Sequence, residues 1–224
     1  MQRSRLERYA PLAGVVFFVI LVVAVIVGGS DTPDNDDSTA KVVAWWARHD
    51  SDQIAASILA VYAMGALVWF AASVRSAIAR VEGGTGRLAT LSFVGSVFVG
   101  IGLLVSATFG FAAADTVGDV PATVTQTLSV LNNDSWFPIP LGIALMVGAA
   151  GIAALRYGWL PKWAGWLSLV IAVVAVTPVG FFGVMAGVLW VLVVSIVLFR
   201  RESAAAVSTP AASPRPASAT GTAS

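Results

Sequence analysis

Residues 163–199 have the sequence WAGWLSLVIAVVAVTPVGFFGVMAGVLWVLVVSIVLF, without one charged side chain. A membrane-spanning helix needs about 20 apolar residues, so this stretch is too long for a single crossing. Thr177-Pro178-Val179-Gly180 near its middle is a turn signal. We therefore expect two short helices, over about 163–179 and 181–199, joined by a tight hairpin.

The whole chain has the composition of an integral membrane protein. Its 224 residues are 58% hydrophobic and 11% charged, and its mean hydropathy is +0.86. A soluble domain carries about 25% charged residues, so there is no room here for a separate one. The sequence has no cysteine, which excludes disulfides, thiolate catalysis and cysteine metal sites.

The other apolar runs predict four more spanning helices. The first run, Pro11 to Val27, follows a basic segment and precedes the small residues Gly29-Ser30, as in a cleavable signal peptide. It exceeds the about 7–15 apolar residues of such a signal, so we expect a retained helix. The expected spans are about 11–28, 53–79, 88–114, 138–155, 163–179 and 181–199, within one transmembrane domain at 10–201.

Three polar segments lie outside these spans. Residues 31–40 form an acidic loop that is too short and too charged to pack a core. Residues 119–134 carry apolar side chains at helical spacing, which predicts a short surface helix: Val120, Val124, Leu128 and Leu131. Residues 202–224, rich in Ala, Ser, Thr and Pro, cannot bury enough apolar surface to fold, so we expect a disordered tail.

The positions of the charges support an even number of crossings. With six spans, all nine aspartates fall on one side, and eleven of the 13 Lys and Arg residues fall on the other. Cytoplasmic loops are enriched in Lys and Arg, so the basic side is the cytoplasmic one. Lys162 and Arg200 share that side only if residues 163–199 cross twice. We therefore expect an all-α bundle of six transmembrane helices with both termini, including residues 1–9, in the cytoplasm.

The interior of the expected spans is polar only through hydroxyl groups. Ionisable residues at membrane depth mark proton relays and ion paths, and the nearest one, Arg75, is about one turn from a helix end. This pattern argues against pumps and antiporters. The hydroxyls, which usually bond to their own or a neighbouring helix, are Ser57, Tyr62, Ser73, Ser92, Ser96, Ser106, Thr108, Ser168, Thr177 and Ser195.

Small residues recur at four-residue spacing in two of the expected helices. Small side chains at this spacing let helix backbones approach closely. They favour packing inside the bundle, and a homodimer or a membrane-protein partner is the alternative. The rows are Ser92, Ser96 and Gly100; Gly102, Ser106 and Gly110; and Gly183 with Gly187.

Residues 45–53, Trp45-Trp46-Ala47-Arg48-His49-Asp50-Ser51-Asp52-Gln53, hold the only histidine and two adjacent tryptophans. Tryptophan favours the membrane interface, and Asp50 and Gln53 have the spacing of an N-cap residue and its N3 partner. The stretch therefore predicts where a helix re-enters the bilayer. His49, Asp50 and Asp52 are alternatively metal ligands, although no second histidine completes the set. Trp45, Trp46, His49, Asp50 and Asp52 are our candidates for an outer-face site that recognises a partner or lipid.

No sequence motif indicates catalysis or a cofactor. Gly83-Gly84-Thr85-Gly86 follows no expected strand and lacks the Gly-Lys-Ser/Thr ending of a phosphate-binding loop. No Gly-x-Ser-x-Gly elbow frames a serine nucleophile, and no basic patch indicates nucleic-acid binding. We expect no enzymatic activity, no cofactor, no metal and no nucleic-acid partner.

Several short motifs occur in a characteristic order. They are Trp-Trp-Ala-Arg-His-Asp at 45–50, Glu82-Gly83-Gly84, ALRYGWLPKWAGWL at 154–167, and the closing Phe199-Arg200-Arg201. In this order they resemble a group of uncharacterised actinobacterial multi-pass membrane proteins, defined as a domain of unknown function. The resemblance implies a six-helix fold in the bacterial plasma membrane, and it implies no activity and no site residues.

Two functional hypotheses follow. The leading one is a non-enzymatic accessory or interaction protein of the membrane, because the chain lacks buried charge and catalytic motifs but has small-residue helix faces. The alternative is a permease for a small molecule or lipid, with an outer vestibule formed by residues 31–52 and 115–137. A cavity that reaches Tyr62 or Ser106 favours the permease, and a bundle packed solid from face to face counts against it.

Overall fold

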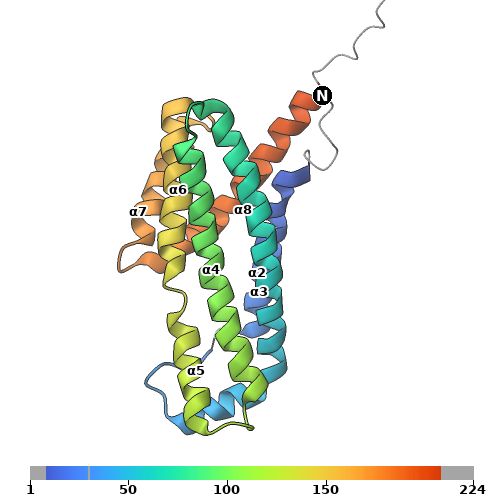
Figure 1. Cartoon of the computed structure of the whole chain (residues 1–224), viewed down its shortest axis with the longest axis vertical. Helices are drawn as coiled ribbons and strands as arrows, with labels where there is room; N and C mark the ends of the chain where they lie inside the picture. The colour runs from blue at the N-terminus through green and yellow to red at the C-terminus, as the bar shows by residue number, and fades with distance from the viewer. Residues whose placement is uncertain (1–8, 30, 208–224) are drawn as a thin grey trace, which may run out of the picture.

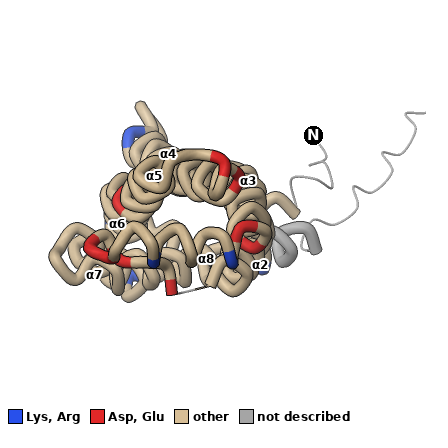
Figure 2. Tube along the Cα trace, turned by 90° about the horizontal axis from the view of Figure 1, so that it is seen from below, with Lys and Arg blue, Asp and Glu red and all other residues tan. Residues whose placement is uncertain are grey.

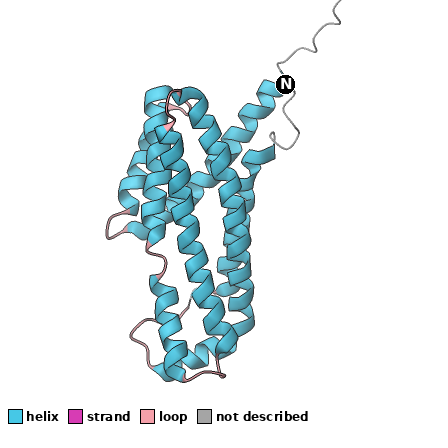
Figure 3. Cartoon of the chain, in the orientation of Figure 1, coloured by secondary structure: helices cyan, strands magenta, loops and turns pink. Residues whose placement is uncertain are grey.

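The computed structural model describes residues 9–29 and 31–207, and this part of the chain is helical and contains no strand (Figures 1 and 3). A 3-10 turn, η1 (Ala10–Leu12), leads into the first helix, α2 (Ala13–Gly28). Five helical segments are long and apolar enough to cross a membrane, as expected for a multi-pass all-α membrane protein. The remaining helices are α3 (Thr39–Glu82), α4 (Arg87–Thr116), α5 (Ala122–Asp134), α6 (Pro138–Tyr157), α7 (Lys162–Ala175) and α8 (Gly180–Val207).

The helices run between two ends of opposite charge. The α3–α4 and α6–α7 connections lie at one end, together with the start of α2 and the end of α8 (Figure 1). We call it the basic end, because the basic side chains at these helix termini are Arg75, Arg80, Arg87, Arg156, Lys162, Arg200 and Arg201. The opposite, acidic end consists of the 31–38 loop, the start of α3, the end of α4 and α5, and Figure 2 is a view onto it.

Helix α3 begins earlier than the sequence predicted. It runs from Thr39, not from near Gln53, and its N-cap is Ser38, whose hydroxyl accepts the Lys41 N–H at 3.4 Å. The predicted N-cap at Asp50 was therefore wrong, because residues 39–52 continue the helix. Only His49 departs from helical geometry, with φ −120° and ψ 17°, and it marks a kink. With 44 residues, α3 is about 66 Å long.

Helices α4 and α6 pack backbone against backbone. A Cβ added to Gly95 would lie 2.3 Å from the Met146 amide nitrogen and 2.7 Å from the Gly142 carbonyl oxygen. In the same contact the Ser92 hydroxyl donates to the Met146 carbonyl at 3.0 Å. The other small residues also face neighbours within the chain: Gly100 meets Met64, Gly102 meets Ile139, Gly183 meets Ala175 and Gly187 meets Ile143.

The connection between α3 and α4 is held by the Glu82 carboxylate. Its two oxygens accept the backbone N–H groups of Leu88 at 2.8 Å and Ala89 at 3.0 Å. These donors belong to the first turn of α4, where a helix leaves N–H groups without backbone partners. The three intervening glycines have φ between 53° and 62°, a region that glycine adopts without steric cost. The basic end therefore fixes α3 against α4.

Residues 163–199 form the expected hairpin. In its turn the Gly180 N–H donates to the Thr177 carbonyl at 2.8 Å, and the turn lies about halfway along the molecule (Figure 1). Helix α7 ends at Ala175 rather than near residue 179. Its 14 residues are about 21 Å long, shorter than the about 30 Å hydrocarbon core of a bilayer. The described chain thus holds five candidate spans and one shorter apolar helix.

Helix α8 crosses the bundle and returns to the start of the chain. The Ser195 hydroxyl donates to the Pro11 carbonyl, and the Phe199 ring stacks on Tyr9 with centroids 6.1 Å apart. The helix continues to Val207, so the predicted tail at 202–224 begins as helix, because alanines are strong helix formers. Residues 208–224 of that tail and residues 1–8 of the expected cytoplasmic N-terminus lie outside the described residues.

Helix α5 packs against α3 and α4 with its polar face. Its buried residues are Thr125 and Ser129, whereas Val124 and Leu131 are 41% and 42% exposed. Of the predicted apolar stripe, Leu128 packs against the buried cluster at this end. The surface helix is present as predicted, but its apolar stripe does not decide which face is buried. The interior of the acidic end is consequently more polar than the sequence indicated.

Candidate ligand-binding cavity

The two adjacent tryptophans lie inside the acidic end. Trp45 and Trp46 are 5% and 1% exposed, in a small cluster with Val42, Ala113 and Ala114. Trp45 and Trp46 therefore do not lie against the membrane surface, contrary to what the preference of tryptophan for the interface predicted. They are buried between α3 and α4 and pack these two helices together. Both indole Nε1 atoms are buried without a hydrogen-bond partner among the described residues.

His49 is held by its own helix at the α3 kink. Its ring stacks on Trp45 with centroids 4.5 Å apart, and its Nδ1 lies 2.9 Å from the Trp45 carbonyl oxygen. Asp50 and Asp52 are exposed, and Asp50 accepts the Ser51 N–H at 2.6 Å. In the described part of the chain, no three His, Asp or Glu residues come together as a metal site. The five sequence candidates thus divide into a buried aromatic pair, a stacked histidine and two solvent-facing carboxylates.

A cavity of about 210 Å³ lies beside this region, between α2, α3 and α4, with one residue of α5 in its wall. Ser106, whose exposure to a cavity was the criterion for the permease hypothesis, lines it. Tyr62 is 65% exposed on the outside of the bundle instead, and His49 is not in the lining. The polar lining residues are Thr32, Gln53, Ser57, Ser106 and Asn132, and the apolar wall includes Leu21, Ala24, Val25 and Leu103.

Asn132 forms the polar floor of the cavity. The Ser106 hydroxyl lies 3.2 Å from Asn132 Oδ1 and 3.4 Å from the Asn132 carbonyl oxygen, in position to donate to either. Gly110 leaves the space open, because a Cβ there would lie 3.1 Å from Asn132 Oδ1 and 3.4 Å from Ser57 Oγ. The Asn132 amide and the Ser57 hydroxyl therefore border the same small volume.

Gln53 forms the opposite edge of the cavity and also ends α2. Its side-chain Nε2 donates to the carbonyl of Gly28, the last residue of that helix. Gln53 is 8% exposed. The carbonyl of Gly28 receives no N–H from its own helix, because it lies at the C-terminal end, and the buried Gln53 amide supplies the missing donor. The bond ties the cavity wall on α3 to the end of α2.

A network of hydrogen bonds fastens α5 to the acidic loop next to the cavity. The Asn133 amide lies 2.9 Å from the Pro33 carbonyl and 3.0 Å from Asn35 Oδ1, and Asn35 donates to Asp134 at 3.1 Å. On the same loop the Asp37 carboxylate accepts Lys41 Nζ at 2.7 Å. That hydrogen bond lowers the pKa of Asp37. Because Asn133 follows the cavity residue Asn132, the loop and the cavity floor are held together.

The lining determines what kind of ligand fits. It contains hydroxyl, amide and aliphatic groups and no ionisable side chain. A charge placed there would lose its hydration without gaining a counter-charge, which is costly. A small molecule with one polar uncharged group and an apolar portion matches both walls. The arrangement supports binding and offers no nucleophile–base pair.

Part of this site is predictable from the sequence. Ser57 and Ser106 are polar residues within expected spans, whereas the pattern around Gln53 predicts a helix cap and nothing in the sequence points to Asn132. Asn132 lies three residues after Ser129, on the face of α5 that the structure buries, and the sequence pattern of α5 does not indicate that face. Comparison of the chain with protein-family models, with curated proteins and with solved structures finds no match.

Proposed function

We propose that this protein is a non-enzymatic membrane protein that binds a small uncharged molecule in the cavity at its acidic end. The observation that carries the proposal is the cavity lining, in which Gln53, Ser57, Ser106 and Asn132 face an aliphatic wall without any ionisable group. Ligand sites are typically apolar cavities with a few placed polar groups. The volume of about 210 Å³ is below the usual range of about 300–1,000 Å³, so the ligand is small.

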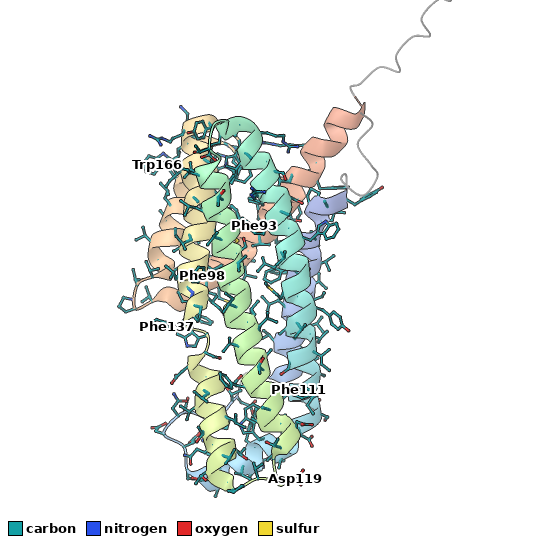
Figure 4. All side chains as sticks on the ribbon, viewed as in Figure 1. Phe93, Phe98, Phe111, Asp119, Phe137 and Trp166 are labelled. Carbon is teal, nitrogen blue, oxygen red and sulfur yellow. The ribbon has the colours of Figure 1, made fainter. Side chains whose placement is uncertain are left out.

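We further propose that the acidic end faces outward and the basic end faces the cytoplasm of a bacterium, with six crossings of the plasma membrane. The support is the excess of Lys and Arg at the basic end. The 20 residues of α6 are about 30 Å long, which matches one bilayer core. Phe137, 81% exposed, projects where α5 gives way to α6 (Figure 4). This assignment agrees with the actinobacterial membrane-protein family that the sequence resembles, and it places the cavity at the outer membrane boundary.

Binding is better supported than transport or partner recognition through the small-residue rows. Between the cavity and the basic end, the helices of the bundle pack around fully buried side chains such as Leu67, Phe70 and Val147. A permease would have to separate these helices. The small-residue rows contact neighbours within the chain, so a partner would need another surface. We therefore propose that the accessory protein expected from the sequence acts by binding a ligand.

The absence of cysteine from the sequence makes a direct test possible. Ser106→Cys places a single thiol in the cavity, with Ser51→Cys as an exposed reference and Ala63→Cys as a fully buried one. A membrane-impermeant maleimide is added to intact cells. Labelling is then repeated with hexan-1-ol, hexanoate or hexylammonium, which share one chain length and differ in charge.

We expect the thiol at position 106 to react more slowly than that at 51 and faster than that at 63. Hexan-1-ol should slow its reaction several-fold, and the two ions should not. If position 106 reacts no faster than position 63, the cavity is not open to the outside. If the ions protect it as well as the alcohol does, the uncharged ligand class is wrong.

A further inference from the structure

The α7–α8 hairpin carries an apolar groove that the proposed function does not use. Its volume is about 300 Å³. Its floor consists of buried side chains, among them Ile171, Trp190 and Val194, and its walls include Trp163, Leu167 and Leu189, which are about half exposed or more. The Trp190 Nε1 donates to the Ser168 hydroxyl at 2.8 Å, so the polar atom of this side chain is satisfied and the floor is apolar.

The groove follows from the way the two helices diverge. At the turn α7 and α8 are in close contact, because a Cβ on Gly183 would lie 2.3 Å from the Ala175 amide nitrogen. From there α8 crosses toward the start of α2, while α7 continues alongside α6 (Figure 1). Side chains fill only part of the widening space between them. The groove therefore opens toward the basic end of the molecule.

Basic side chains stand at that open end. Lys162 is exposed and lies between Pro161 and Trp163, which both line the groove. Arg201 follows the lining residue Val197 by one helical turn, and its guanidinium donates to the Trp159 carbonyl. Trp159 is one residue from Leu160, which also lines the groove. Arg201 therefore stands beside the groove lining, and Lys162 lies at the start of α7, at the same end of the molecule.

We propose that this groove holds one acyl chain of an anionic phospholipid of the cytoplasmic leaflet, with the headgroup phosphate beside Lys162 and Arg201. Basic pockets next to membrane helices on the cytoplasmic side bind anionic headgroups. A helix about 10 Å wide occupies about 420 Å³ per turn, more than the whole groove, so a single extended chain is the better occupant. The choice of leaflet rests on the orientation proposed above, and the proposal does not depend on the outer cavity.

A fluorophore on a single cysteine tests the site. Leu167→Cys places it in the groove wall, and Leu91→Cys is the matched control. Leu91 is also exposed, one turn from Arg87 at the basic end of α4, but it is not in the groove lining. Each labelled full-length protein is placed in phosphatidylcholine bilayers. Brominated-acyl phosphatidylglycerol or brominated-acyl phosphatidylcholine is then titrated in as the quencher.

At position 167 we expect phosphatidylglycerol to reach half-maximal quenching at a mole fraction at least fivefold lower than phosphatidylcholine, because one basic residue strengthens the association about fivefold. At position 91 the two lipids should differ by less than twofold. Lys162→Gln should lower the preference at 167 about fivefold, and Arg87→Gln should leave it unchanged. Equal quenching by the two lipids at 167, an equal preference at 91, or an unchanged preference in Lys162→Gln would each overturn the proposal. Since Lys162 is exposed, its substitution leaves the packing of the hairpin intact.

Discussion

Substitution of Gly95 by alanine tests the closest contact in the bundle. The added Cβ would lie 2.3 Å from the Met146 nitrogen, and ordinary contact begins near 3.4 Å, so α4 and α6 must separate by about 1 Å. Both opposing atoms belong to the backbone, and no rotamer change can relieve the overlap. Overpacking costs about 1–3 kcal/mol. The alanine recovers up to about 1 kcal/mol of helix propensity, so we expect a net loss of about 1–2 kcal/mol.

Gly65→Ala is the matched control for this substitution. Gly65 also lies inside a long helix, but a Cβ there meets nothing within 4 Å, so only the propensity gain of about 0.5–1 kcal/mol remains. Equilibrium unfolding in mixed detergent micelles, followed by tryptophan fluorescence, gives both free energies. The two variants should differ by about 1.5–3 kcal/mol. Equal stability of Gly95→Ala and Gly65→Ala would refute the backbone contact between α4 and α6.

Three further predictions concern single side chains. Glu82→Ala removes the acceptor for two backbone N–H groups at the start of α4 and should lower the free energy of unfolding by about 1 kcal/mol, with Glu82→Gln losing less in the same assay. Gln53→Leu leaves the buried Gly28 carbonyl unsatisfied and should cost about 1–3 kcal/mol; an unchanged stability would mean that water replaces the amide. The Asp37 carboxyl has a lowered pKa through its hydrogen bond with Lys41, so its contribution to stability is complete above the ordinary value of 3.8 and is lost as the pH falls through the lowered value. Unfolding midpoints of the native protein and of Asp37→Asn should therefore differ at pH 6 and converge as the pH falls well below 3.8, and a constant difference would contradict this.

The all-helical, multi-pass character of the described chain was predictable because its signals are long and redundant. Residues 11–27 are apolar throughout. In lipid, a single stretch of this kind satisfies its backbone hydrogen bonds within itself only as a helix. Pro178 and Gly180 predicted the turn at Thr177, and the hydrogen bond from the Gly180 N–H to the Thr177 carbonyl confirms it. The length of α7 was harder to predict, because Val176 and Val179 are as apolar as the helix before them. Hydropathy does not show where such a helix stops.

The acidic end was less predictable because tertiary contacts override local patterns there. The segment before Gln53 contains the polar and charged residues of an expected helix start, yet α3 continues through it, with Trp45 and Trp46 buried against α4. Helix α5 buries Thr125 and Ser129 although an apolar stripe is available. The cavity depends on both outcomes, since Gln53 and Asn132 come from these segments. Side chains that meet only in the folded structure leave no spacing signal in the sequence.

The α3–α4 pair is fastened on both sides of the cavity. At the basic end the Glu82 carboxylate holds the start of α4, about 44 Å along α3 from Gln53. At the acidic end Trp45 and Trp46 of α3 are buried against Ala113 and Ala114 of α4. A ligand wider than the cavity would have to break one of these contacts, so the cavity selects its ligand by size.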